Sequence, residues 1–367
     1  MLCWNVELEL TRKLTYAESG VDRDLRAESK KALLMLKKTF KCSRYGKVIE
    51  VPYGKLFPFH DRYLDLQVEG VGTKVLIAQI VDKYDTIGID GIAMVVNDII
   101  RSGADPLAIV DNIHAEVSDP SMVNEWIKGI TKGAEESGCI VPGGEIGDVA
   151  DLIKGQRMHK GFDLVCAAIG EVNKQRVISG RKIKPGDTII GLKSSGIHSN
   201  GISLARKVLF KEWGGKYSAD ESPGGLNREV GYEVLEPTRI YVKPLLQVAE
   251  KVELKGAVHI TGDAYLKFDR LQIFSPGIGF EFDNFKPIPV FELIRQTAAV
   301  LGHRITDEEM FRTFNMGWGF AIVVAEHERD EALDVLERTR MEPEQIGTVT
   351  ASRGIKIFNN KRKIILR

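Results

Sequence analysis

Alternating apolar and polar positions predict a β-strand and a long helix in the first half of the chain. Every second residue is apolar over residues 64–69, which predicts a half-buried strand with a polar, mostly acidic outer face. Apolar residues then recur at helical spacing over residues 86–103, so a helix is predicted there. The second face of this helix carries polar residues: Asp90, Asn97, Asp98 and Arg101.

The same patterns predict an α/β fold in two domains. Further strands are predicted over residues 107–110, 164–172, 188–192, 257–260 and 320–325, and helices over residues 121–137, 201–212, 237–252 and 328–340. A closing hairpin is expected to turn at Asn359 and Asn360. The chain becomes polar near residues 171–176, and its 367 residues suit two cores. The predicted domains are therefore residues 1–175 and 176–367.

Charge and composition limit the partners that are expected. The 51 basic residues balance the 51 acidic ones, so neither nucleic acid nor a membrane surface is expected as the main partner. The first residues lack the apolar core of a signal peptide, and no apolar run has the roughly 20 residues of a membrane helix. The four cysteines form no CxxC pair, which argues against a zinc site or a disulfide framework. A cytoplasmic location is expected.

The segment Glu69-Gly-Val-Gly-Thr-Lys74 directly follows the first predicted strand. Two glycines, Gly70 and Gly72, would let the backbone approach a ligand closely. Thr73 offers a hydroxyl group and Lys74 a positive charge, which suit phosphate groups, while Glu69 is available for Mg²⁺. The segment is not a Walker A motif, and a plain tight turn would have the same composition.

Two other acidic positions are candidates for a metal site. Asn97 and Asp98 lie on the polar face of the predicted helix, and Mg²⁺ takes one or two protein carboxylates together with phosphate oxygens. Glu145 follows the pair Gly143-Gly144 and is a candidate ligand of metal or substrate. A solvated helix face and an exposed turn are the alternative interpretations.

The segment Ser194-Ser-Gly-Ile-His-Ser-Asn-Gly201 lies between a predicted strand and a predicted helix. Hydroxyl and amide groups at a helix N-terminus bind anions, and His198 is a candidate to neutralise a phosphate or to move a proton. Helix capping by serine or asparagine is the alternative. Two later segments, residues 259–262 and 312–319, mix glycine with polar residues at strand edges, and core packing would explain them equally well.

Taken together, these segments resemble the aminoimidazole ribonucleotide synthetase (phosphoribosylformylglycinamidine cyclo-ligase) family. The resemblance extends from Leu14 almost to the C-terminus. It rests on motifs in the family's order: EGVGTK (69–74), DTIGID (85–90), GAxP (103–106), GGE (143–145), SSGIHSNG (194–201), EPTRIYVKP (236–244), HITG (259–262) and RTFNMGWG (312–319).

The resemblance implies a fold, an activity and cofactors. Family members use ATP and Mg²⁺ to phosphorylate the formyl amide oxygen of formylglycinamidine ribonucleotide, after which an amidine nitrogen closes the imidazole ring. The implied fold is an N-terminal α/β domain that pairs in a homodimer and a C-terminal α/β sandwich domain. A small-molecule nucleotide substrate lies between the domains. Phosphoryl transfer needs positioning and charge neutralisation more than covalent chemistry.

Roles are carried over position by position. The implied catalytic residues are His198, Asp98 and Lys74. The implied nucleotide-binding residues are Gly70, Gly72, Thr73, Lys74, Asp90 and Asn97. The implied substrate-binding residues are Ser194, Ser195, Ser199, Asn200, Gly144 and Thr261. The implied metal ligands are Glu69, Asp98 and Glu145.

The chain departs from the family pattern at several ligand-facing positions. Glu69 stands where the family usually has aspartate, and Asp263-Ala264 stands where it has a glycine pair. The N-terminal glycine-rich loop keeps one glycine over residues 51–58, and the sequence after Glu145 is Ile146-Gly147. Two alternatives therefore stay open. One is a divergent paralogue that acts on another amide substrate, and the other is a non-catalytic nucleotide-binding protein.

Overall fold

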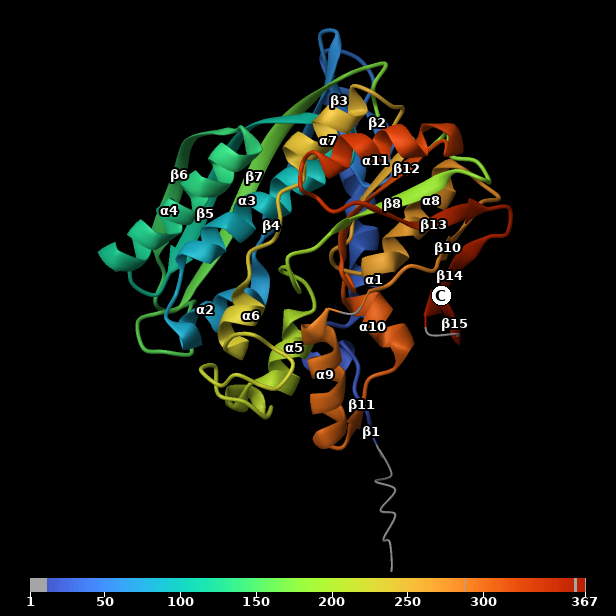
Figure 1. The fold of residues 1–367 in the computed structure, drawn as a ribbon. Helices are drawn as coiled ribbons and strands as arrows, with labels where there is room; N and C mark the ends of the chain where they lie inside the picture. The colour runs from blue at the N-terminus through green and yellow to red at the C-terminus, as the bar shows by residue number, and fades with distance from the viewer. Residues whose placement is uncertain (1–11, 287, 360–361, 367) are drawn as a thin grey trace, which may run out of the picture.

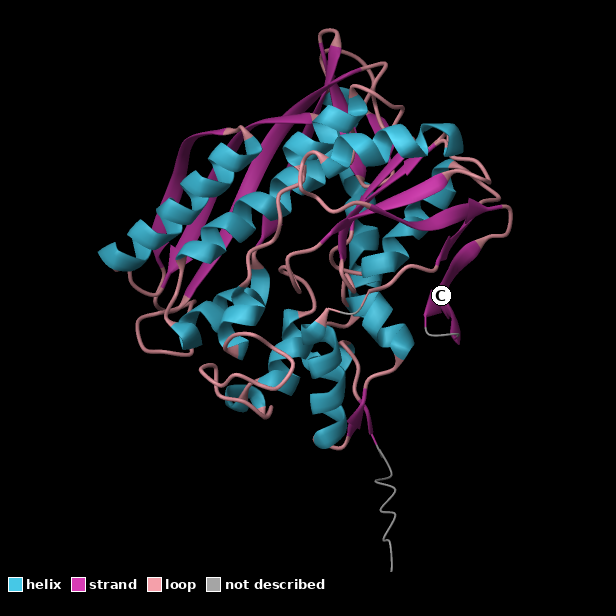
Figure 2. Ribbon diagram, in the orientation of Figure 1, coloured by secondary structure: helices cyan, strands magenta, loops and turns pink. Residues whose placement is uncertain are grey.

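The computed structural model describes residues 12–286, 288–359 and 362–366 and shows two large β-sheets (Figure 1). A six-stranded sheet is formed by the first half of the chain and a seven-stranded sheet by the second half. Helices lie beside both sheets, as Figure 2 shows. The predicted α/β class is confirmed. Within the described ranges, no helix has both the length and the apolar character needed to cross a membrane.

The N-terminal sheet has its strands in the order β2-β3-β4-β7-β5-β6, and only β5 and β6 run parallel to each other. The strands are β2 (Ile49–Val51), β3 (Gly54–Phe59), β4 (Arg62–Gly70), β5 (Asp105–Ala115), β6 (Ile140–Asp148) and β7 (Phe162–Asn173). One face is covered by helices, as Figure 1 shows. These helices are α3 (Asp85–Ile100) and α4 (Pro120–Ser137), and α3 follows the short α2 (Val75–Val81).

Local sequence signals explain where α4 begins and ends. Asp119 caps the helix by accepting hydrogen bonds from the backbone N–H groups of Ser121 and Met122, and Pro120 occupies the first helical position. Gly138 ends the helix in the left-handed conformation. Gly129 lies so close to α3 that a Cβ atom there would be 1.9 Å from the carbonyl oxygen of Asp85. Glycine therefore permits the close packing of α3 on α4.

Strand β4 has the opposite orientation to the one predicted. Asp65 is buried, whereas Leu66 and Val68 are 60% and 63% exposed. The polar side faces the protein interior because a buried hydroxyl group is available there: Ser102 donates a hydrogen bond to Asp65 at 2.7 Å. The prediction of a solvated acidic face is therefore wrong, and the sheet leaves an apolar face uncovered.

The C-terminal sheet has the strand order β15-β14-β10-β13-β8-β12-β9. Its strands are β8 (Thr188–Lys193), β9 (Gly256–His259), β10 (Gly279–Phe282), β12 (Trp318–Val324), β13 (Glu344–Thr350), β14 (Gly354–Asn359) and β15 (Arg362–Leu366). The helices of this half are α5 (Ile202–Leu209), α6 (Val230–Leu235), α7 (Val242–Ala249), α8 (Asp269–Phe274), α9 (Pro289–Val300), α10 (Asp307–Thr313) and α11 (Arg329–Glu337). The change from one sheet to the other falls between β7 and β8, and the predicted domain boundary at residues 175 and 176 stays a prediction. Of the predicted turn, Asn360 lies outside the described residues.

The N-terminal segment crosses to the C-terminal half of the molecule. Strand β1 (Arg12–Lys13) pairs with β11 (His303–Arg304), and α1 (Arg23–Lys30) follows before the 3-10 helix η2 (Lys31–Cys42). Arg23 anchors α1 through an ion pair with Glu309 at 3.1 Å and hydrogen bonds to α10. The first described residues therefore pack on the second half of the chain.

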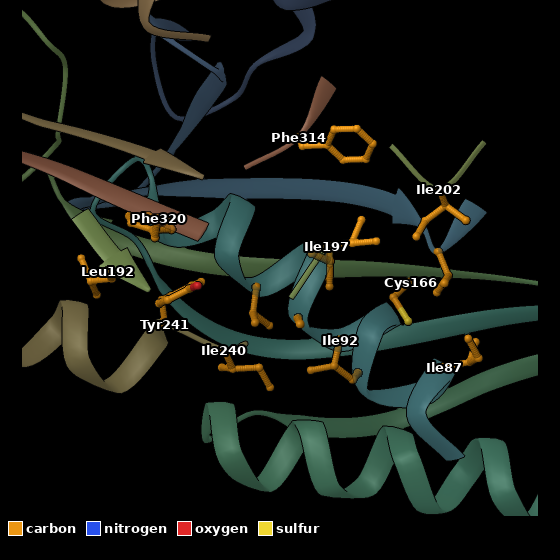
Figure 3. Packing of buried hydrophobic residues seen from close by; sticks show 14 of the residues in the cluster. Ile87, Ile92, Cys166, Leu192, Ile197, Ile202, Ile240, Tyr241, Phe314 and Phe320 are labelled. Carbon is orange, nitrogen blue, oxygen red and sulfur yellow. The ribbon is translucent and has the colours of Figure 1, made fainter. Parts of the chain in front are cut away.

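Helix α3 lies between the two halves and is buried along almost its entire length. Ile87 and Ile92 belong to one hydrophobic cluster with residues of the C-terminal half, including Ile197, Tyr241 and Phe320 (Figure 3). The polar face of α3 is buried as well. The alternative of a solvated helix face is therefore wrong, because the C-terminal half covers that face.

Candidate functional site

The segment after β4, for which phosphate binding was predicted, forms a short helical turn. Gly70 ends β4, and Gly72 begins the 3-10 helix η3 (Gly72–Lys74) with a φ of 70°. The hydroxyl group of Thr73 lies 3.2 Å from that of Ser203 on α5. Gly72 has the backbone conformation that favours glycine. The turn thus joins β4 directly to α2 and contacts the C-terminal half.

Lys74 and Asp90 form an ion pair that solvent does not reach. The ammonium group lies 2.8 Å from the carboxylate, and both side chains are 0% exposed. Lys74 also donates to the carbonyl oxygen of Glu236 at 2.6 Å, and Asp90 Oδ1 accepts from Thr238 N and Oγ1 and from Ser199 Oγ. We call these residues the Lys74–Asp90 cluster. It joins the two halves, and the predicted nucleotide contact of Lys74 stays a prediction beside this interdomain contact.

Asn97 makes a second connection between the halves. Its amide nitrogen donates to the carbonyl oxygen of Arg239 at 2.9 Å, and its side-chain oxygen accepts from the backbone N–H of Tyr241 at 2.9 Å. Both ends of the amide are therefore occupied by backbone groups of the chain. Asn97 thus has a structural role between the halves, and its predicted role in nucleotide binding stays a prediction.

Asp98 lies at the centre of a second, chemically different group of residues. Its carboxylate contacts Arg101 NH2 at 2.6 Å and His259 Nδ1 at 2.8 Å. Glu69 shares a side-chain hydrogen bond with Asp98, and Lys267 interacts electrostatically with both carboxylates. We call these five residues the Asp98 cluster. The cluster thus contains two acidic residues, an arginine, a lysine and a histidine at the interface of the two halves.

The environment changes the protonation of the Asp98 cluster. Burial opposes the charge on Asp98, but Arg101 and the hydrogen bond from His259 hold the pKa of Asp98 below its ordinary value. Burial and the nearby Asp98 charge raise the pKa of Glu69. Burial lowers the pKa of Lys267 to about 8, although Asp98 acts against this shift. Burial lowers the pKa of His259 to about 4, so its neutral imidazole donates from Nδ1 to Asp98 at pH 7.

The Asp98 cluster is covered by the turn between β2 and β3. Tyr53 stacks over the guanidinium group of Arg101 at 4.9 Å and donates a hydrogen bond from its hydroxyl group to the carbonyl oxygen of Lys267 at 3.0 Å. Beneath it is a cavity of only about 10 Å³, lined by Val51, Pro52, Tyr53, Asp65, Gln67, Asp98, Arg101 and Ser102. The structure therefore shows this cluster in a closed arrangement.

Residues of the segment 194–201 form hydrogen bonds with one another and with other residues of the chain. His198 is buried, adopts a φ of 65° and accepts a hydrogen bond at Nε2 from the backbone N–H of Ser195. Burial and the charge of His259 lower the pKa of His198 well below 6.5. Ser194 donates to Asn315 at 3.1 Å. A buried neutral imidazole offers no charge to a phosphate, and the predicted catalytic role of His198 stays a prediction.

The remaining substrate candidates divide between the two clusters. Ser199 belongs to the Lys74–Asp90 cluster, and Thr261 accepts a hydrogen bond from Lys267. Asn200 lies beside Gly262, since a Cβ atom there would be 3.2 Å from the Asn200 Oδ1. The structure therefore brings Thr261 and Asn200 together with the 259–262 segment.

Gly144 and Glu145 are separated from the predicted metal site. They lie on the edge strand β6, where Gly144 is paired with Asp111 and Glu145 with Asn112. The register aligns Glu69 with Gly144 three strands away, roughly 14 Å across the sheet, and places Glu145 on the opposite face. Among the residues that the structure describes, no three His, Cys, Asp or Glu side chains gather as metal ligands. Glu145 therefore lies apart from Glu69 and Asp98, and the metal roles of these residues stay predictions.

Several residues of the site received no role from the sequence. Arg101 lies on the predicted helix and His259 inside a quoted motif. Their common partner Asp98 is 161 residues from His259 along the chain, so the sequence does not reveal the contact. Lys267 and Tyr53 lie outside the quoted motifs. A charged residue in an otherwise apolar run, such as Lys267 between Leu266 and Phe268, is the signal that was available.

Comparison with known proteins places the chain in a family. The sequence pattern of "AIR synthase related protein, N-terminal domain" matches residues 56–172, and that of the corresponding C-terminal domain matches residues 184–359. The chain therefore belongs to the AIR synthase related family. A phosphoribosylformylglycinamidine cyclo-ligase of Pyrococcus furiosus is 42% identical over 96% of this chain and 100% of that protein. Its namesake in Methanocaldococcus jannaschii is 37% identical over 95% of each chain.

Solved structures share the fold at low sequence identity. The thiamine monophosphate kinase of Aquifex aeolicus has a TM-score of 0.59 and 16% identity, with 92% of this chain and 98% of that one covered. T. maritima PurL complexed with ATP has a TM-score of 0.56 and 13% identity, with 86% of this chain and 44% of that one covered. These similarities confirm the two-domain α/β architecture that the resemblance implied.

Proposed function

We propose that this chain is an ATP-dependent phosphoribosylformylglycinamidine cyclo-ligase that acts in the cytoplasm in purine biosynthesis. The observation that carries the proposal is the 42% identity to a cyclo-ligase along 100% of that relative's length. The Asp98 cluster supports it, because phosphoryl transfer depends on positioned charges more than on a nucleophile. The substrate class is a small-molecule nucleotide with a formyl amide group.

The chemistry of the Asp98 cluster fits Mg²⁺. Glu69 and Asp98 are in side-chain hydrogen-bond contact, and burial together with the nearby Asp98 charge raises the pKa of Glu69. Mg²⁺ binds one or two protein carboxylates and completes its coordination with water and phosphate oxygens. Glu69 and Asp98 would hold the ion, which would neutralise phosphate charge of ATP when bound.

The residues around this pair prepare it for such a role. Arg101 holds Asp98 in place with two hydrogen bonds. Its Nη2 atom donates to the Asp98 carboxylate, and its Nε atom donates to the backbone carbonyl oxygen of Asp98. His259 orients the other carboxylate oxygen as a neutral donor. Tyr53 covers the cluster and excludes water. A dry, pre-oriented arrangement strengthens electrostatic interactions with a phosphoryl group and costs little reorganisation during reaction.

The test measures two products in one reaction. Phosphate release from ATP with Mg²⁺ is followed with and without formylglycinamidine ribonucleotide, together with formation of aminoimidazole ribonucleotide. Both products are expected in equal amounts and only when the ribonucleotide is present. Phosphate release that needs another amide substrate would favour the divergent paralogue. Nucleotide binding without turnover would favour the non-catalytic protein, and either result would overturn the proposed activity.

We also propose that the enzyme is a homodimer that pairs through the uncovered face of the N-terminal sheet. The register places Leu66 opposite Ile169, and Val68 opposite Ala167, which in turn lies opposite Val110. Leu66, Val68 and Val110 are each at least 45% exposed. A continuous apolar sheet face of this kind is costly in water and typical of an interface between subunits.

Sedimentation velocity of matched variants tests the dimer. Leu66→Glu places a charge at the centre of the face and is expected to shift the protein from dimer to monomer. Ile273→Glu on α8 is the control, since Ile273 is 73% exposed but lies in the C-terminal half. A wild-type monomer, or equal effects of both substitutions, would contradict the proposed interface.

A further inference from the structure

The turn that carries His259 into the Asp98 cluster has an unusual backbone. Asp263 and Ala264 adopt φ angles of 67° and 40°, in the left-handed region that residues with a Cβ atom seldom occupy. Two such residues in succession are rarer still. Ala264 is also completely buried, so its conformation is enclosed by packing. Strained backbone of this kind persists only where surrounding contacts hold it, and such places are often functional.

Lys267 holds this turn closed from the C-terminal side. Its ammonium group donates to the carbonyl oxygen of His259 at 3.1 Å and to the hydroxyl group of Thr261. The backbone N–H of Ala264 donates to the carbonyl oxygen of Thr261 at 2.6 Å. The side chain of Lys267 thus reaches back across the strained residues to the point where the turn leaves β9.

Arg23 holds the turn from a different part of the chain. Its Nε atom lies 3.3 Å from Asp263 Oδ1, while its guanidinium group is anchored on Glu309 and α10. Asp263 is 37% exposed in this pair, so the contribution of Arg23 is screened by solvent more than that of Lys267. Lys267 is therefore the stronger of the two constraints on the turn.

The position of the His259 ring follows from the position of its backbone. The ring is buried, stacks on Phe320 with 6.0 Å between ring centroids, and bonds Asp98 through Nδ1. Lys267 binds the carbonyl oxygen of the same residue. A change in the turn would therefore rotate the imidazole away from Asp98 and leave that carboxylate with Arg101 as its remaining partner.

We propose that Lys267 is a positioning residue which holds the strained turn 259–264 so that His259 orients Asp98. The inference rests on the proposed function, because Asp98 is one of the two carboxylates assigned to the metal and phosphate groups. In this role Lys267 acts on the reaction through His259. The alternative role, direct contact between its ammonium group and a substrate phosphate, makes different predictions for glycine variants of the turn.

The experiment combines loss of the lysine with relief of the strain. Lys267→Met is expected to lower kcat by about tenfold, the scale seen when a residue that orients a ligand is removed, while KM changes less than about threefold. Adding Ala264→Gly lets the turn keep its conformation without the lysine, because glycine adopts positive φ freely. The double variant is expected to recover at least threefold in kcat.

A spectroscopic measurement reports the same step without turnover. The ¹⁵N signals of the His259 ring, identified by their loss in a His259→Gln variant, give the tautomer and the hydrogen bond at Nδ1. They are expected to change in Lys267→Met and to return in the double variant. Because this measurement needs no substrate, it separates failure of the positioning role from failure of the proposed cyclo-ligase activity.

Two matched controls complete the design. Lys243 also donates to a backbone carbonyl oxygen, that of Glu135, at 3.1 Å, and Lys243→Met is expected to leave kcat unchanged. Arg340 has a φ of 61° and is exposed, so Arg340→Gly relieves strain elsewhere and is expected not to rescue Lys267→Met.

The possible results decide between the roles. A rise in KM without rescue by Ala264→Gly would overturn the positioning role in favour of substrate contact. Unchanged kcat and unchanged His259 signals in Lys267→Met would overturn both roles. Should Lys267→Met not fold, Lys267→Gln is measured in its place, since the shorter amide loses the reach to the carbonyl oxygen of His259.

Discussion

Helix α3 contributes residues to two polar clusters, and the difference in their composition indicates a structural role for one and a chemical role for the other. In the Lys74–Asp90 cluster one acid meets one cation, and backbone and hydroxyl donors surround the carboxylate. In the Asp98 cluster two acids share a hydrogen bond, the histidine Nε2 has no partner, and the neighbouring turn is strained. Both are buried, so burial alone does not distinguish them.

The difference shows what each cluster contributes. A buried ion pair whose acid and cation bind each other and groups of both halves holds two elements together. Like charges in contact, with an unpaired nitrogen nearby, are unfavourable in isolation and become favourable when a cation or ligand binds. The Lys74–Asp90 cluster therefore joins the domains, and the Asp98 cluster is the candidate reaction centre.

The largest expected effect follows from breaking the structural cluster. Lys74→Met leaves the Asp90 carboxylate buried without its cation and is expected to lower the free energy of unfolding by about 3–5 kcal/mol. Urea denaturation measures this loss. Lys255→Met is the matched control, because Lys255 forms a buried pair with Asp187 at 2.6 Å within the C-terminal half. A stable Lys74→Met protein with a raised KM for ATP would restore the nucleotide contact predicted from the sequence.

Asp98→Asn is expected to lower turnover strongly and to change stability only slightly. The substitution removes one of two carboxylates that face each other, so the folded state loses repulsion as well as the bond to Arg101. Turnover is expected to fall by roughly 100-fold, as when a preorganised charged group is removed from an active site, with only a small change in stability. Asp111→Asn, at another buried acid, is the control in the coupled phosphate-release assay. Equal losses in both variants would show that buried charge in general, and not Asp98, is required.

The buried histidines predict a pH dependence of stability. Burial lowers the pKa of His198 and of His259, the latter to about 4, whereas both have a pKa near 6.5 when unfolded. The unfolded chain therefore binds more protons, and stability decreases as the pH falls from about 6.5 toward 4. Each histidine contributes about 1 kcal/mol per pH unit in this window.

His198→Asn isolates one of these contributions. Asparagine tolerates the left-handed backbone and does not titrate, although its shorter side chain does not reach the Nε2 position that accepts from Ser195. Glu69 has the opposite effect, because its raised pKa favours folding at low pH. Its contribution is present in both proteins, so it cancels when the unfolding free energies of the variant are subtracted from those of the wild type. The variant is expected to show a flatter dependence of unfolding free energy on pH between 6.5 and 5. An unchanged slope would mean that His198 is protonated in the folded state.

The smallest expected effect concerns the strained turn by itself. Ala264→Gly removes the unfavourable left-handed alanine, worth about 1–2 kcal/mol, but adds flexibility to the unfolded chain that costs about 0.5–1 kcal/mol. A net gain of roughly 0.5 kcal/mol in unfolding free energy is expected by thermal or chemical denaturation. A loss of stability would indicate that the methyl group packs in a way that outweighs its backbone strain.

The sequence predicted the elements of the fold better than their surroundings. Periodicity located α3 and β4 to within a few residues because it depends only on local spacing. It assigned the wrong face of β4 to solvent, since alternation does not reveal which side a second domain or subunit covers. The motif residues were found, but their roles depended on partners far along the chain. Asp98 and His259 are one example, and Lys74 with the Glu236 carbonyl is another.

The attachment of α3 to the C-terminal half has a consequence for the motions of the folded protein. Asp90, Asn97 and Asp98 each bind the other half from the same helix, so a hinge motion between the halves would break all three connections at once. The two halves are therefore expected to open and to unfold together, and hydrogen exchange of the backbone amides of α3 would report the free energy of that opening.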